Sequence, residues 1–556
     1  MKASDLLVRC LEAEKVRVVF GLPGEENEDL LFSLADSKIR FVACRHEQGA
    51  AFMADVWGRL TGMAGVCLAT LGPGATNLIT GVADAQLDKS PLVAITGQGS
   101  VERLHKESHQ AIDVVSMLKP VTKWNTSINR PEVIPEVVRK AFKLAEREKP
   151  GATHLELPED VARMEVDASP IPPRRLRRPA PDYKALDAAF DILRSARRPL
   201  VLAGNGAIRK LASKHLRQFI EATGIPVVTT FMGKGAVSCE DPRSLFAVGM
   251  LARDFVQDAF DEADVVMTVG YDVAEYDPKL WSSRRALRVI HLDFEPAEVY
   301  AHYQPEVELI CDISAALWEL NLRVQRSPLH FGNWALPVRE QVARDVASYQ
   351  LREGEPFTVP GALSLLRQLM APEDVLISDV GAHKVWIARN FCALEPNTVL
   401  ISNGLASMGL SLPGGIAARL AQPERRVVCA MGDGGFLMNA AEIETATRCG
   451  VCFPILVFND ASYGLIRWKQ RNRRAFEVGT ALTNPDYVKF AESFGIRGYS
   501  PRTVAELERV LGEVIPAQQM CIVEIKVDQS PDVELSHKLA AWAQARTQAP
   551  SAAGDS

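Results

Sequence analysis

Residues 427–460 read "VVCAMGDGGFLMNAAEIETATRCGVCFPILVFND" and contain the clearest structural pattern in the chain. Two apolar runs flank a segment with helical periodicity, which predicts a strand, a helix and a second strand. A unit of this kind joins neighbouring parallel strands through a right-handed crossover. Asp433 follows the first strand and Asn459 ends the second. We therefore expect both side chains at the carboxyl edge of one sheet, where open α/β sheets bind ligands.

The residue types at this edge indicate a metal and a phosphate group. A carboxylate and an amide oxygen are hard ligands, and Mg²⁺ is commonly held by few protein oxygens together with phosphate oxygens. Gly432, Gly434 and Gly435 surround Asp433, and glycines let a diphosphate approach backbone N–H groups at the start of a helix. A lone "GDG" is a common turn, so the prediction depends on its spacing from Asn459.

Strands alternate with helices along nearly the whole chain, which predicts an α/β fold of three doubly wound parallel-sheet domains. We place these domains at residues 1–170, 183–340 and 358–535, with a tail at 541–556 that we expect to be disordered. A linker rich in proline and arginine, "DASPIPPRRLRRPAPD", separates the first two domains.

Composition narrows the class of protein. The chain has 556 residues, 47% of them hydrophobic, and its 63 basic and 69 acidic residues give a formal charge of −6. We expect no nucleic-acid partner, no membrane span or signal peptide, and a cytoplasmic location. The ten cysteines are scattered in a way that suits reduced thiols, and the pair Cys449 and Cys452 lacks the further ligands that a zinc or redox site needs.

These motifs resemble those of the thiamine diphosphate (ThDP) enzymes, in which "GDG" is followed by an asparagine pair. This chain has "ND" at 459–460 in place of the commoner "NN". The resemblance implies that Mg²⁺ is bound by the side chains of Asp433 and Asn459 and by the backbone carbonyl of Ala461. It also implies that residues 1–170 bind the pyrimidine ring of ThDP and that residues 358–535 bind its diphosphate.

A second motif, "RHEQGA" at 45–50, is nearly verbatim that of the family. The resemblance makes Glu47 the catalytic glutamate that hydrogen-bonds the aminopyrimidine ring, although a glutamate that opens a helix could merely stabilise the helix dipole. By the same resemblance Gln110 is an active-site glutamine. The other cofactor-binding positions implied are the diphosphate neighbours Gly381 and His383, the carbonyl of Ala406, and Met408, whose side chain would wedge the cofactor into its bent shape.

The resemblance also implies an assembly. Glu47 and Asp433 belong to different predicted domains, and in this family the pyrimidine domain of one subunit faces the diphosphate domain of another. A homodimer is therefore the smallest assembly expected, and a homotetramer is implied by the family.

Within the family the chain most resembles the acetolactate synthases, especially the catabolic type that lacks flavin. The stretches "GMLARD" at 249–254 and "YDVAEYDPKLW" at 271–281 differ from the flavin and arginine elements of the biosynthetic branch. This resemblance implies a transferase that decarboxylates pyruvate on ThDP and adds the two-carbon fragment to a second pyruvate, giving 2-acetolactate and CO₂. FAD binding is not expected.

Other functions remain open at this stage. A sulfoacetaldehyde acetyltransferase, a glyoxylate carboligase or another 2-oxo acid decarboxylase would share most of these motifs, because one fold hosts many chemistries. Glyoxylate carboligases lack the glutamate found here as Glu47. A catalytically silent binding or regulatory homologue would keep the fold, but the intact Glu47, Asp433 and Asn459 argue against it.

Overall fold

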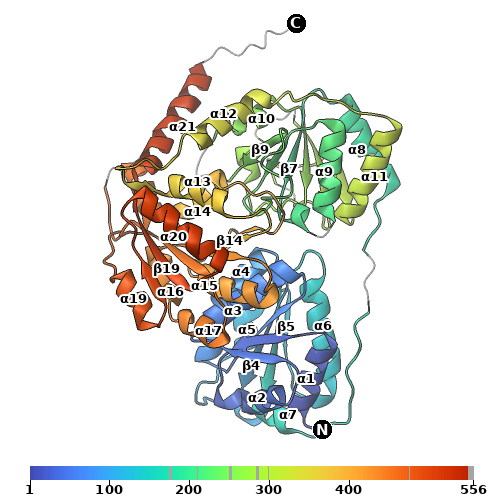
Figure 1. Cartoon of the computed structure of the whole chain (residues 1–556). Helices are drawn as coiled ribbons and strands as arrows, with labels where there is room; N and C mark the ends of the chain where they lie inside the picture. The colour runs from blue at the N-terminus through green and yellow to red at the C-terminus, as the bar shows by residue number, and fades with distance from the viewer. Residues whose placement is uncertain are drawn as a thin grey trace.

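The computed structural model describes residues 1–174, 178–209, 211–249, 253–282, 287–298, 300–474 and 476–548. It contains three α/β domains, each built on its own parallel sheet with helices on both faces, and the C-terminal domain packs against the other two (Figure 1). This confirms the predicted fold class. Among the described residues, every helix is too short or too polar to span a lipid bilayer.

The N-terminal domain has a six-stranded sheet in the order β2-β1-β3-β4-β6-β5. Its strands are β1 (Val18–Gly21), β2 (Arg40–Ala43), β3 (Gly65–Ala69), β4 (Leu92–Gln98), β5 (Trp124–Ser127) and β6 (Ala152–Pro158). Its α-helices are α1 (Ala3–Ala13), α2 (Glu28–Ala35), α3 (Glu47–Thr61), α4 (Pro73–Leu87), α5 (Val114–Leu118), α6 (Ile134–Glu146) and α7 (Glu159–Arg163). Helix α3 is buried almost all round, which is the pattern of a helix packed between layers.

The central domain has a second six-stranded sheet in the order β12-β11-β10-β7-β8-β9. Its strands are β7 (Pro199–Ala203), β8 (Val227–Thr229), β9 (Ser244–Ala247), β10 (Val265–Val269), β11 (Arg288–Asp293) and β12 (Val307–Ile310). Its α-helices are α8 (Tyr183–Ser195), α9 (Ala212–Thr223), α10 (Gln257–Glu262) and α11 (Ile313–Arg326), and α12 (Leu336–Ala347) leads on to the next domain.

The C-terminal domain has a seven-stranded sheet, β13-β19-β17-β16-β14-β15, with β18 paired to β19. Its strands are β13 (Phe357–Thr358), β14 (Val375–Ser378), β15 (Val399–Ile401), β16 (Val427–Gly432), β17 (Pro454–Asn459), β18 (Arg497–Tyr499) and β19 (Cys521–Asp528). Its α-helices are α13 (Val359–Leu369), α14 (Ala382–Asn390), α15 (Ser411–Ala421), α16 (Asp433–Asn439), α17 (Glu442–Cys449), α18 (Gly464–Arg474), α19 (Tyr487–Ser493), α20 (Val504–Ala517) and α21 (Ser530–Gln548).

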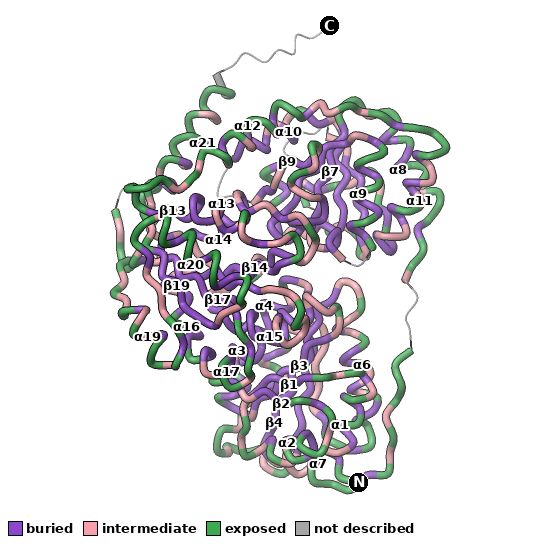
Figure 2. Tube along the Cα trace, in the orientation of Figure 1, coloured by how far each residue is buried: buried purple, intermediate pink, exposed green. Residues whose placement is uncertain are grey.

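The buried residues are continuous across the domain boundaries (Figure 2). One apolar cluster joins the N-terminal and C-terminal domains, where α3 packs on α15. A second cluster joins the central and C-terminal domains. The C-terminal domain is therefore packed against both of the other domains.

Two expectations from the sequence need correction. We expected residues 541–556 to be disordered, but α21 continues to Gln548, with Trp542 packed edge-on against Phe255 at 5.5 Å between ring centroids; residues 549–556 lie outside the described chain. We expected only reduced cysteines, but Cys239 and Cys392 are paired across the central and C-terminal domains, with Cα atoms 5.6 Å apart. Their separation of 153 residues leaves no local signal of this pairing.

Candidate functional site

Asp433 and Asn459 lie at one edge of the C-terminal sheet. Strands β16 and β17 are parallel neighbours with Gly432 opposite Phe458, so the two side chains leave adjacent strand ends, as the sequence predicts. The connection between the strands differs from the prediction of one helix, because it contains α16 and α17 with a break at residues 440–441.

Hydrogen bonds fix the orientation of both side chains. The Asn459 Nδ2 donates to Glu524 Oε1 at 2.6 Å, which turns the Asn459 oxygen towards Asp433. The Nδ2 of Asn484 donates to Asp433 Oδ2 at 2.6 Å and to Asn459 Oδ1 at 2.9 Å. The two predicted metal-ligand oxygens therefore converge on one point.

The third predicted ligand, the carbonyl of Ala461, follows directly in the chain. Ala461 has a left-handed φ of 50°, and its carbonyl accepts a hydrogen bond from Leu482 N at 2.8 Å. The carboxylate of Asp460 is turned elsewhere, because it accepts from both the backbone N and the Oγ of Ser462 and from Gln529. The departure from the family's "NN" thus adds no second carboxylate to the metal-ligand set.

The charge of Asp433 depends on its surroundings. Burial raises the pKa of Asp433 to about 6, and the hydrogen bond from Asn484 works in the opposite direction. A divalent cation beside the carboxylate would stabilise its ionised form. The site therefore suits a cation better than it suits an isolated buried negative charge.

A cavity of about 320 Å³ opens beside these residues. Eight of the sequence-predicted cofactor residues line it, namely Gly381, His383, Ala406, Met408, Gly432, Asp433, Gly434 and Gly435. Asn459 is not among the lining residues, although its neighbours Phe458 and Asp460 are. The structure therefore gathers, in one cavity, positions that lie more than fifty residues apart in the sequence.

The lining fits a diphosphate. A Cβ added at Gly435 would lie 2.1 Å from Asp379 Oδ2, and one at Gly434 would lie 2.8 Å from Tyr463 Cε1, so only glycine leaves room there. His383 is buried, and within the described residues its Nε2 has no hydrogen-bond partner. Burial lowers the pKa of His383 to about 3, so the ring is neutral at neutral pH and can donate one hydrogen bond to a phosphate oxygen.

The segment that carries Ala406 and Met408 is held at its C-terminal side by Asp379. Asp379 Oδ1 accepts hydrogen bonds from Gly409 N at 2.7 Å and from Leu410 N at 3.2 Å. Burial raises the pKa of Asp379 to about 7 despite these bonds. Asp379 follows strand β14 just as Asp433 follows β16, so the same strand-end rule could have identified it from the sequence.

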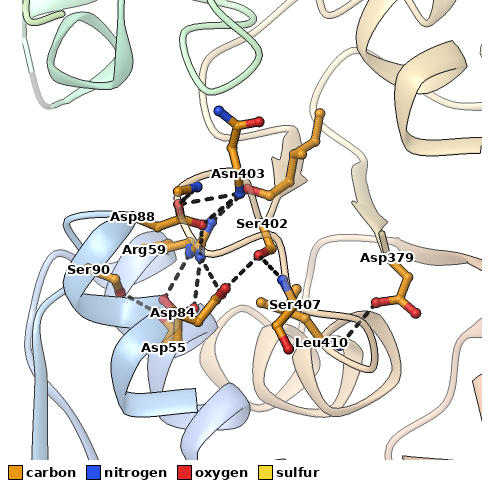
Figure 3. Close-up of polar contacts among 12 residues, drawn as sticks. Asp55, Arg59, Asp84, Asp88, Ser90, Asp379, Ser402, Asn403, Ser407 and Leu410 are labelled. Carbon is orange, nitrogen blue, oxygen red and sulfur yellow. Dashed lines mark hydrogen bonds and ion pairs between the residues drawn. The ribbon is translucent and has the colours of Figure 1, made fainter. Parts of the chain in front are cut away.

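A buried arginine holds the other side of this segment (Figure 3). Arg59 of α3 forms ion pairs with Asp55, Asp84 and Asp88 at 2.8, 3.2 and 2.7 Å. Burial alone would lower the pKa of Arg59, but the three aspartates raise it well above its usual value. The cluster therefore keeps its guanidinium charged.

The aspartates of this cluster reach across to the C-terminal domain. Asp84 accepts from Ser402 Oγ at 2.5 Å, and Asp88 accepts from Gly404 N at 2.5 Å. Ser402 Oγ in turn accepts from Ser407 N at 3.1 Å. The N-terminal domain thus positions the loop that leads to Met408.

Glu47 and Gln110 both lie in the N-terminal domain near the segment 72–74, and neither lines the cavity. Glu47 is buried at the first position of α3, and its Oε2 accepts from Asn77 Nδ2 at 3.0 Å. A Cβ at Gly74 would lie 3.4 Å from Glu47 Oε1, and one at Gly72 would lie 2.5 Å from the carbonyl of Gln110. The chain therefore carries two separate groups of predicted site residues.

Sequence reasoning missed Asn484, Glu524 and the Arg59 cluster. Asn484 lies 25 residues after Asn459, in the loop before α19, and Glu524 lies on β19. No local pattern marks either residue, because each acts through contacts formed only in the folded chain.

Three family models match consecutive parts of the chain. They are described as the N-terminal TPP (thiamine pyrophosphate) binding domain, the central domain and the C-terminal TPP binding domain of thiamine pyrophosphate enzymes. They match residues 1–117, 186–320 and 379–525, respectively. Each matched range lies within one of the three domains described above.

Curated relatives are similar over nearly the full length. The acetolactate synthase of Bacillus subtilis (strain 168) is 33% identical over 96% of this chain and 95% of its own length. The catabolic acetolactate synthase of Raoultella terrigena is 34% identical over 94% and 95%, respectively. The large subunit of acetolactate synthase isozyme 2 of Escherichia coli (strain K12) is 32% identical over 96% and 97%.

Proposed function

This chain belongs to the thiamine diphosphate-dependent enzymes related to acetolactate synthase, and from that premise we propose that it makes 2-acetolactate and CO₂ from two molecules of pyruvate. The observation that carries the proposal is the cavity in which Asp433 and its flanking glycines meet His383 and Met408. The similarity to acetolactate synthases over 94–96% of the chain supports this reaction over others of the family.

Residues of the C-terminal domain would hold the cofactor and its metal. Asp433, Asn459 and the Ala461 carbonyl would supply oxygens to Mg²⁺, and the backbone N–H groups at Gly434 and Gly435 would bind the diphosphate. When bound, ThDP supplies the electron sink for decarboxylation and carbon–carbon bond formation. The protein's part is to orient the groups, exclude water and move protons.

Glu47 would move the essential proton. Its carboxylate is buried and hydrogen-bonded to Asn77, which fixes the position of a group that exchanges a proton with the aminopyrimidine ring. Because Glu47 and Gln110 do not line the cavity of their own chain, we assign them to the site of a second subunit. The enzyme is then a homodimer at least, with each site built from two chains.

The central domain supports the proposal that the enzyme works without FAD. The glycine-containing turn at 204–206 follows β7, where a dinucleotide's phosphates could meet backbone N–H groups. Both carboxylate oxygens of Glu275 lie 3.1 Å from Asn205 N, and a Cβ at Gly204 would meet Glu275 Oε1 at 3.0 Å. The Glu275 carboxylate therefore already accepts from the backbone N–H of Asn205, which a bound phosphate would otherwise need. Residues 250–252 of the compared stretch lie outside the described chain.

The test is to supply purified protein with ThDP, Mg²⁺ and pyruvate, and to identify the products by mass spectrometry. We expect 2-acetolactate and CO₂ from protein that shows no flavin absorbance. Stoichiometric bound FAD would contradict the flavin-free proposal. Acetaldehyde as the main product, or acetyl phosphate from sulfoacetaldehyde and phosphate, would assign the chain to a sister activity.

A further inference from the structure

A buried carboxylate of the C-terminal domain contacts the turn that precedes Glu47. Glu442 is the first residue of α17 and is fully buried. Its Oε1 accepts hydrogen bonds from Arg45 N and from His46 N, each at 3.0 Å. These two residues lie between β2 and α3, which begins at Glu47. The bond to Arg45 spans 397 residues of sequence, so it depends on the packing of the two domains.

The Glu442 carboxylate is itself fixed by its surroundings. Its Oε2 accepts from Thr445 Oγ1 at 2.6 Å, one turn further along α17. It also packs closely on α3, because a Cβ added at Gly49 would lie 2.6 Å from Glu442 Oε1. Glycine at this position of the "RHEQGA" motif thus leaves room for the carboxylate. Both oxygens have defined partners, so the position of the carboxylate is well determined.

Two arginines hold α17 against the same part of the N-terminal domain (Figure 1). Arg448 of α17 donates to the carbonyl of Ala43, the last residue of β2. In the opposite direction, Arg40 at the start of β2 donates to the carbonyl of Cys449 at 3.3 Å. Helix α17 is therefore fastened to the strand that leads to Glu47.

The placement of Glu47 depends on this turn. The backbone N–H groups of Arg45 and His46 precede the hydrogen-bond ladder of α3, so the helix itself offers them no acceptor. Glu442 supplies that acceptor. The side chain of Glu47 is held separately, since its Oε2 accepts from Asn77 Nδ2 at 3.0 Å. The turn thus determines where the Glu47 backbone lies, and Asn77 determines where its carboxylate points.

We propose that Glu442 is a positioning residue for Glu47, because it accepts the two N–H groups and so fixes the turn from which the catalytic carboxylate projects. This inference rests on the proposed function, in which Glu47 exchanges a proton with the aminopyrimidine ring. Proton transfer requires hydrogen-bond reach between donor and acceptor, and a displacement of about 1 Å can lower a rate about 100-fold. Loss of Glu442 should therefore lower the rate of proton exchange more than the affinity for ThDP.

The test measures exchange of the thiazolium C2 proton of bound ThDP in D₂O by NMR, together with the kcat and KM for pyruvate and the Kd of ThDP. Glu442→Ala should lower C2 exchange and kcat about 10-fold or more, with KM and Kd within about 3-fold of the wild type. Glu442→Gln should restore both rates, because its Oε1 still accepts the two N–H groups and its amide can donate to Thr445 Oγ1.

Glu444→Ala is the matched control. Glu444 lies on the same helix and forms surface ion pairs with Arg448 at 2.9 Å and with Arg45 at 3.8 Å, so its loss should change neither rate. Gly49→Ala tests the contact without removing Glu442, because the added Cβ displaces the carboxylate, and it should also lower C2 exchange. Combining Gly49→Ala with Glu442→Ala should lower exchange no further than Glu442→Ala alone, since the Cβ then meets no carboxylate.

The outcomes separate this inference from the proposed function. Wild-type C2 exchange in Glu442→Ala would overturn it, and so would an equal loss of exchange and ThDP affinity, or a Glu442→Gln variant as slow as Glu442→Ala. If Glu442→Ala does not fold, wild-type exchange in Gly49→Ala overturns the inference in its place. If Glu47→Gln loses exchange while Glu442→Ala keeps it, the proposed function stands and only the positioning role is wrong. If Glu47→Gln also keeps exchange, the proposed role of Glu47 itself fails.

Discussion

Replacing Arg59 with leucine should destabilise the protein by about 3–5 kcal/mol, the usual cost of removing one partner from a buried ion pair. Leucine keeps the apolar stem but removes a guanidinium that pairs with three aspartates. Their carboxylates are at most 1% exposed. Water therefore cannot replace the lost cation, and the remaining charges repel one another.

The free energy of unfolding can be measured by urea denaturation monitored through tryptophan fluorescence. The transition to analyse is the one in which the N-terminal and C-terminal domains unfold. Arg163→Leu is the control, because Arg163 is 56% exposed and pairs with Asp29 at the surface. Such surface pairs contribute at most about 1 kcal/mol. Adding Asp84→Asn to Arg59→Leu should recover part of the loss, since one buried charge is removed.

Arg59→Leu should also affect cofactor binding. Asp84 and Asp88 hold Ser402 and Gly404, which begin the loop containing Ala406 and Met408. We therefore expect weaker ThDP binding in Arg59→Leu. A stability within about 1 kcal/mol of the wild type would refute the reasoning, because it would show that the aspartates do not need this cation.

Three further predictions concern single residues. Glu47→Gln should fold and bind ThDP but lose most exchange of the thiazolium C2 proton, because an amide cannot accept that proton. NMR measures this exchange, and a wild-type rate in the variant would exclude the proposed role of Glu47. Asp433→Ala should retain little ThDP after gel filtration unless Mg²⁺ is high, whereas full retention would place the metal elsewhere. Burial lowers the pKa of Lys234 from 10.5 to about 7. Between pH 7 and pH 10.5 the unfolded chain therefore binds one more proton than the folded chain, so the free energy of unfolding should rise with pH in this range. Lys234→Met should abolish this rise in urea midpoints; an unchanged slope would contradict it.

Local sequence patterns were enough to predict the sheets and the strand-end residues. The apolar runs before Asp433 and Asn459 must form neighbouring parallel strands, which places both side chains at one edge whatever else the chain does. The role of Glu47 came from the resemblance of "RHEQGA" at 45–50 to the family motif, since a glutamate at the start of a helix is not in itself a catalytic signal. Eight of the ten predicted cofactor-binding residues line one cavity, and the other two, Glu47 and Asn459, do not.

The remaining features depend on contacts between distant segments. Arg59 is one of many arginines in the sequence, and only the packing of α3 and α4 against the loop at 402–404 makes it a buried charge centre. The pairing of Cys239 with Cys392 likewise requires that two domains meet. The last part of α21, residues 541–548, has too weak an amphipathic pattern to be predicted from the sequence alone. Its contact with Phe255 becomes visible only in the folded chain.

The proposed assembly requires that each active site combine Glu47 of one subunit with Asp433 of another. Coexpressing Glu47→Gln and Asp433→Ala chains, and measuring 2-acetolactate formed from pyruvate with ThDP and Mg²⁺, tests this requirement. Each variant alone should be nearly inactive. The mixture should recover about a quarter of wild-type activity, because half of randomly formed dimers contain one intact site out of two. A mixture as inactive as its components would contradict the claim.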